Sequence, residues 1–245
     1  RPVAKSPVLV PQATVQIERR YPQQGGALSR YLVSRLAEHE KETNPSFNKG
    51  SQIWGWLPPV LVGEGRKVQS DWLHTFLLDP TRIRPAAAMR MPKFNMTPDE
   101  ATKLVNYFAA VDNADYPHEF DYQLAGDYMT RANAAYAEKA HGASGQNSTA
   151  PNSNMPENRL DAAMRIVADK KTYCAQCHLI GNYTPQGTVK EMAPDLAEVF
   201  RRLRPGYTRD WIANPEAILP YTGMPVNIPY DAEKPHLGGI SQQIY

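Results

Sequence analysis

Cysteine is scarce in this chain of 245 residues: two are present, too few for a scaffold held together by disulfides. No apolar run approaches the roughly 20 residues of a membrane-spanning helix, and the first residues lack the apolar segment of a signal peptide. The net charge of +2 is too small to indicate nucleic-acid binding by itself. Because 42% of the residues are hydrophobic and 21% are charged, we expect a folded protein of one or two domains, not a disordered chain.

Proline, in contrast, is frequent, with 22 residues against 15 glycines, which favours short elements joined by extended connections. Apolar periodicity nevertheless predicts helices over residues 25–42, 70–78, 97–111 and 157–171, a partly helical stretch over 124–138, and a helix around Trp211. The start of the helix over residues 97–111 is marked most clearly, because Thr97, Pro98 and Glu100 fit a capping box with proline at the first helical position. Ser70 or Asp71 is the expected N-cap of the second helix. The sequence therefore predicts a mainly all-α protein.

The two cysteines stand together in the run Cys174-Ala-Gln-Cys177-His178, a pattern typical of c-type haem attachment. Two thiols three residues apart lie on one face of a helical turn, where each can add to a vinyl group of the haem. His178 would then bind the iron as the proximal ligand. A zinc site is disfavoured because it would need two further soft ligands, and no other cysteine exists. A thioredoxin-like dithiol is disfavoured because it would need a strand before the motif, where a helix is predicted.

The sixth iron ligand decides between an electron carrier and a catalyst, since a thioether closes the site and an open position admits small molecules. Met224 is the first candidate, because Pro225 restricts it to extended backbone and Gly223 allows a close approach to the haem. Met192 is the second candidate, in a loop that Pro194 would stiffen, and His236 is the third.

The second half of the chain repeats landmarks of the first half. The matched pairs are Asp71-Trp72 with Asp210-Trp211, Asp79-Pro80 with Asn214-Pro215, and Met91-Pro92 with Met224-Pro225. Matched landmarks over a period this long predict two copies of one fold, of which only the second carries cysteines.

The second half resembles a class I cytochrome c domain in its leading helix, its Cys-Ala-Gln-Cys-His run, Ala193-Pro194-Asp195-Leu196, the Trp211 helix and Gly223-Met224-Pro225. The resemblance implies that Cys174 and Cys177 form thioethers to one haem c per chain, that His178 is the proximal ligand and that Met224 is the distal ligand. Residues 24–112 resemble a second such domain without a haem motif.

The domain prediction is thus an extended arm over residues 1–23, a haemless domain over 24–138, a flexible linker over 139–158 and a haem-binding domain over 159–245. The family fold ends with a helix that packs on the first, but no convincing helix follows Met224. We expect either that the chain is truncated or that something else covers this face, because an uncovered leading helix would expose Leu160 and Val167.

These features predict electron transfer, with the chain acting as a redox subunit or module of a larger respiratory or dehydrogenase complex and the haemless domain binding other subunits. Basic residues near the motif would form either a docking rim for a redox partner protein or an ordinary solvated face: Lys170, Lys171, Arg201, Arg202 and Arg204.

Two alternatives stay open: a free-standing soluble carrier, and a single-haem enzyme with an open distal site, such as a peroxidase. The resemblance implies a periplasmic or otherwise exported location, with membrane association through other segments or partners left open. We expect no nucleic-acid partner and no membrane span in this chain.

Overall fold

The structure is a computed structural model that describes residues 26–43, 53, 58–59, 61, 63–87, 89–121, 125–142, 159–171, 173–187, 192–219 and 222–226. Its longer helices are α1 (Gly26–Thr43), α3 (Ser70–Leu78), α4 (Pro98–Val111), α5 (Gly126–Gly142), α6 (Arg159–Ala168) and α8 (Pro205–Ala213). Single-turn helices are α2 (Glu64–Lys67), α7 (Val199–Arg202) and α9 (Pro215–Ile218), with 3-10 turns at Cys174–Gln176 and Leu196–Glu198. In these ranges β structure is limited to three isolated bridges, so the mainly helical class is confirmed.

The predicted helices are confirmed with small shifts at their ends. The capping box of α4 is complete: Thr97 Oγ1 accepts from Glu100 N (3.3 Å), and a Glu100 carboxylate oxygen accepts from Thr97 N (2.8 Å). The N-cap of α3 is Gln69, neither Ser70 nor Asp71. The reason is tertiary, since Ser70 is 6% exposed and its hydroxyl accepts from the Arg204 guanidinium.

Helix α5 continues to Gly142, into the segment predicted to be a linker from residue 139. The alanines and long polar side chains of its last turns are good helix formers, and this local preference extends the helix. Residues 143–158, the N-terminal arm 1–23 and the end of the chain after Val226 lie outside the described residues. The division of the chain into two domains therefore stays a prediction.

The main hydrophobic core lies between α3 and α4. Its buried members are Val68, Leu73, Leu77, Ala101 and Val105. Partly buried side chains pack around them: Trp72, Leu78, Met91, Met96, Leu104, Phe108 and Leu203. The apolar stripe predicted along residues 97–111 does not extend to Val111, which is 63% exposed; the last buried residue of α4 is Ala109, two residues earlier.

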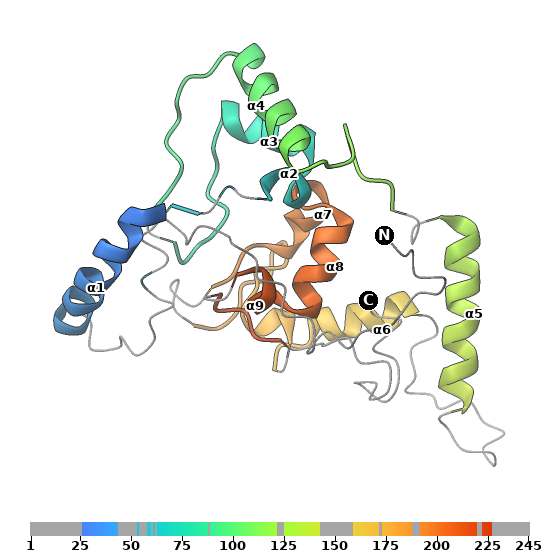
Figure 1. Ribbon diagram of the computed structural model, residues 1–245. Coiled ribbons are helices and arrows are strands. Elements are labelled where there is room, and N and C mark those ends of the chain that lie inside the picture. Colours follow the sequence, from blue (N-terminus) through green and yellow to red (C-terminus); the bar gives the residue numbers. More distant parts are fainter. Residues whose placement is uncertain are drawn as a thin grey trace, which may run out of the picture.

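We call residues 63–121 the upstream half and residues 159–226 the downstream half. Figure 1 shows α2, α3 and α4 grouped directly above α7 and α8, with α6 below them. Leu203 of the downstream half joins the upstream core and forms an antiparallel bridge with Val68. The upstream half thus packs directly against the half that carries Cys174, Cys177 and His178.

Glycine is required where α2 crosses α4. A Cβ atom on Gly65 would overlap the carbonyl group of Phe108 and lie 2.9 Å from Ala109 N. The Gly65 N–H group donates to Asp112 Oδ2 (2.7 Å), so this contact is also hydrogen-bonded. Close packing of two helical backbones at this point therefore depends on the missing side chain.

Helix α6 leads into the haem motif and contacts both the Cys174–Gln176 turn and α5. Ile166 is buried, whereas Leu160 and Met164 are 50% and 59% exposed. Val167 is half-buried. The residues after Val226 lie outside the described residues, so the missing C-terminal helix stays a prediction. No helix among the described residues combines the length and apolar character needed to cross a bilayer.

Candidate haem-attachment site

The two cysteines and the histidine share one tight turn. Cys174–Gln176 form a 3-10 helix, and the carbonyl oxygen of Cys174 accepts from both Cys177 N (3.2 Å) and His178 N (2.9 Å). The side chain of Ala175, 1% exposed, anchors this turn in the interior. Both thiols are free, with Cys174 half-buried and Cys177 exposed. The turn therefore presents two unpaired thiols and an imidazole within five residues of chain.

Burial changes the protonation of two of these groups. It raises the pKa of the Cys174 thiol, against a smaller opposing effect of a backbone hydrogen bond. It lowers the pKa of His178; the Pro194 carbonyl opposes this effect, and the charge of Arg202 adds to it. At neutral pH the His178 side chain is therefore the uncharged imidazole, the form that binds a metal.

The orientation of His178 is set by a backbone carbonyl. Its Nδ1 atom lies 2.7 Å from the carbonyl oxygen of Pro194. A carbonyl oxygen only accepts hydrogen bonds, so Nδ1 carries the proton and Nε2 keeps its lone pair for a metal. The sequence predicts that Pro194 stiffens the loop that carries Met192, but it does not predict this bond. The Ala-Pro-Asp run is the only feature of the sequence that points to this segment. The acceptor itself is a backbone carbonyl, which every residue type has, so the sequence does not identify it.

The segment around Pro194 is itself fixed against the Cys-His turn. Ala193 N donates to Cys177 O (2.7 Å) and Leu196 N donates to Leu179 O (2.9 Å). The Asp195 side chain accepts from Gly181 N (3.0 Å). These bonds hold the Pro194 carbonyl on the Nδ1 side of the imidazole.

The two methionine candidates occupy different places. Met192 is half-buried and directly precedes Ala193, so its backbone belongs to the segment behind the imidazole. Met224 is half-buried beside α8, where its sulfur accepts from Trp211 Nε1 (2.9 Å). The structure thus brings Cys174, Cys177 and His178 together and holds Met224 through α8 instead. The third candidate, His236, lies outside the described residues.

The donor set fits a c-type haem. Two free thiols in one turn suit the two thioether bonds, and an oriented, neutral imidazole suits an iron ligand. A tetrahedral zinc site would need further protein ligands beside the cysteines. Among the residues that the structure describes, no three His, Cys, Asp or Glu side chains form a group that could hold a metal ion.

Comparisons with known proteins give no relative for this chain. It matches no family model, no curated protein and no solved structure. The haem assignment therefore rests on the motif and on the geometry of the Cys174–His178 turn.

Proposed function

We propose that this protein transfers electrons through one covalently bound haem c. The observation that carries the proposal is the bond between His178 Nδ1 and the Pro194 carbonyl, which leaves Nε2 available beside two free thiols. In this proposal Cys174 and Cys177 form the thioethers, and His178 is the proximal ligand. The haem supplies an iron that changes between two oxidation states.

The residues around His178 would tune the haem. The Pro194 carbonyl orients the imidazole and makes it a stronger electron donor to the metal. Arg202 is half-buried, and its charge acts on His178. A positive charge close to the iron disfavours the more positive ferric state, so we expect Arg202 to raise the redox potential.

Met224 is the distal ligand in this proposal. Met192 is the weaker candidate, because its backbone belongs to the segment on the Nδ1 side of the imidazole, whereas Nε2 is the atom that would bind the iron. A thioether sulfur has two lone pairs, so the Trp211 hydrogen bond orients the Met224 sulfur and still leaves one lone pair for iron.

The same hydrogen bond is the observation that favours the alternative, a single-haem enzyme with an open distal site. If Trp211 keeps Met224 away from the iron, small molecules can bind there. The two functions differ in ligand binding, which the experiments below measure.

We propose further that the protein works as a redox module of a larger exported complex. Large apolar side chains are exposed at the end of α4 and in the following connection. They are Tyr107, Val111, Tyr116 and Phe120, each between 58% and 63% exposed. Such surfaces often mark contacts with another protein, so this part of the upstream half is the side that we expect to face other subunits.

The first test is an absorption spectrum of both redox states, together with the ratio of haem to protein. We expect one haem per chain, a far-red band of methionine-bound ferric iron and no rapid uptake of carbon monoxide or cyanide. One haem that binds carbon monoxide at once would support the enzyme instead. Protein produced with haem-attachment machinery but lacking covalent haem would contradict both functions.

Met224→Ala should remove the far-red band, lower the potential and open the iron to cyanide, because the thioether ligand is lost. Potentiometry and cyanide titration measure these changes. Met192→Ala is the matched control and should leave the band in place. If Met192→Ala removes the band and Met224→Ala does not, the distal assignment is wrong.

A further inference from the structure

The junction between the two halves begins with paired backbone segments. Gln69 N donates to Arg202 O (2.9 Å), and Arg204 N donates to Lys67 O (3.0 Å). The Gln69 side chain also donates to Leu203 O (3.1 Å). Residues 202–204 are therefore paired with the upstream half through their backbone groups.

The Arg204 side chain extends this junction into the upstream half. Its Nε donates to Val68 O (2.9 Å), Nη1 to Asp115 O (2.6 Å) and Nη2 to Ser70 Oγ (3.3 Å). The residue is 2% exposed, which corrects both predictions for it, a basic docking rim and a solvated face. One guanidinium group thus joins the start of α3 to the segment that follows α4, a task for which its planar fork of donors is suited.

Arg204 is also the N-cap residue of α8, so the direction of α8 is set at this point. The same helix carries Trp211, whose indole donates to the Met224 sulfur. Along the chain before Arg204, residues 193–196 hold His178 through the Pro194 carbonyl and the bond from Leu196 N to Leu179 O. Arg204 therefore lies between the segment that holds His178 and the helix that holds Met224.

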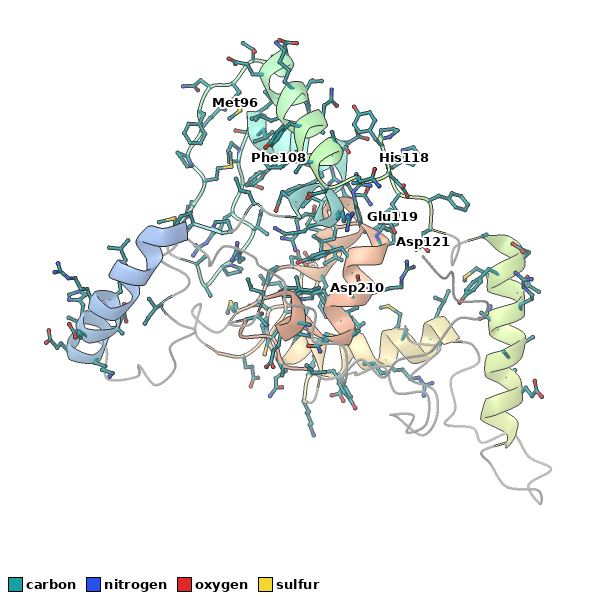
Figure 2. The ribbon with its side chains drawn as sticks, in the orientation of Figure 1. Met96, Phe108, His118, Glu119, Asp121 and Asp210 are labelled. Atoms are coloured by element: carbon teal, nitrogen blue, oxygen red, sulfur yellow. The ribbon has the colours of Figure 1, made fainter. Side chains whose placement is uncertain are left out.

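A second set of contacts fixes α8 against the upstream half. Gly206 N donates to Glu119 Oε1 (2.9 Å), and Arg209 pairs with Asp121 (3.3 Å). Figure 2 shows Glu119 and Asp121 beside α8. Both carboxylates are largely shielded from solvent, with side chains 21% and 17% exposed. Helix α8 is thus held at its first turn and near its middle.

We infer that Arg204 is a positioning residue for the haem ligands, through which the haemless half fixes the Met224 region relative to the His178 region. This inference rests on the proposed haem function. The inference gives the upstream half a role inside the same chain. The upstream half supports and aligns the two segments that carry His178 and Met224. Weakening the junction should release Met224 from the iron while the thioethers and His178 stay in place.

The test compares Arg204→Gln and Arg204→Lys with Arg201→Gln in the full haem-loaded chain. Arg201 is the matched control, because it lies three residues away and is exposed, with an ion pair to Glu198 at 3.8 Å. We expect Arg204→Gln to bind added imidazole about tenfold more tightly, a change of about 1.4 kcal/mol in binding free energy. Its far-red band should be weakened. Arg204→Lys should be intermediate, since an ammonium cannot reach all three acceptors, and Arg201→Gln should match the wild type.

A second readout does not depend on haem. The indole N–H resonance of Trp211, assigned with Trp211→Phe, should exchange with solvent about tenfold faster in Arg204→Gln than in Arg201→Gln. If Arg204→Gln does not fold, Arg204→Lys and Glu119→Ala take its place in the comparison with Arg201→Gln. Glu119→Ala removes the acceptor of the Gly206 N–H group. Glu119→Ala should also speed the indole exchange.

The outcomes separate the two hypotheses. If the Arg204 variants match Arg201→Gln in imidazole affinity, far-red band and indole exchange, the positioning role is overturned. If the wild type carries no covalent haem, the proposed function fails, and the indole exchange by itself decides whether Arg204 fixes the Met224 region.

Discussion

Replacing Cys174 and Cys177 together by serine should abolish covalent haem binding, because a hydroxyl group does not form the thioether that each thiol forms with a vinyl group. Each single variant should keep one thioether at most and retain less haem. Staining a denaturing gel for haem and measuring the intact mass both report this loss. The effect is large because no other cysteine exists in the chain to replace either thiol.

Gln176→Ser is the matched control for these variants. Gln176 belongs to the same 3-10 turn and is exposed, so the change should leave haem attachment intact. His178→Ala should keep some covalent haem but lose the native low-spin spectrum, because the oriented imidazole is removed. Haem that stays covalently attached in the double-serine variant would show that the motif is not the attachment site.

Replacing Gly65 by alanine should destabilise the protein by about 3 kcal/mol, the upper part of the usual cost of overpacking a tight contact. The added methyl group would overlap the Phe108 carbonyl, which is backbone and cannot rotate away as a side chain would. Separating α2 from α4 would also lengthen the bond from Gly65 N to Asp112. Urea unfolding measures the change as a lower midpoint at an unchanged slope.

Gly126→Ala is the control for this substitution. Gly126 is the first residue of α5, and a Cβ atom there would meet no other atom within 4 Å. We expect a change within about 1 kcal/mol, because only the helix preference of the residue is altered. If Gly65→Ala is no more destabilising than Gly126→Ala, the helices do not pack as closely as the structure shows.

The sequence by itself determined the helical elements and the place of the motif. Apolar periodicity predicted α3 and α4 within one residue. The capping box at Thr97 predicted the start of α4, because it depends on neighbours along the chain. The run from Cys174 to His178 likewise needs only one turn of chain to bring its thiols and imidazole together. Both are local properties, and local properties can be inferred from residue order.

Only the tertiary structure decided how this motif is supported. The partner of His178 is the carbonyl of Pro194, and a carbonyl leaves no mark in the sequence because every residue has one. Arg204 follows Arg201, Arg202 and Leu203, and these three closely spaced arginines, as sequence, indicate a solvated face as readily as a docking rim.

The burial of Arg204 depends on Val68, Ser70 and Asp115, which lie far away along the chain. They provide two carbonyl groups and a hydroxyl group as hydrogen-bond acceptors. The hydrogen bond from Trp211 to the Met224 sulfur has the same origin, since it joins α8 to a segment 13 residues further along the chain. Contacts between distant segments depend on how the helices pack together, and one sequence read along its length does not specify that packing.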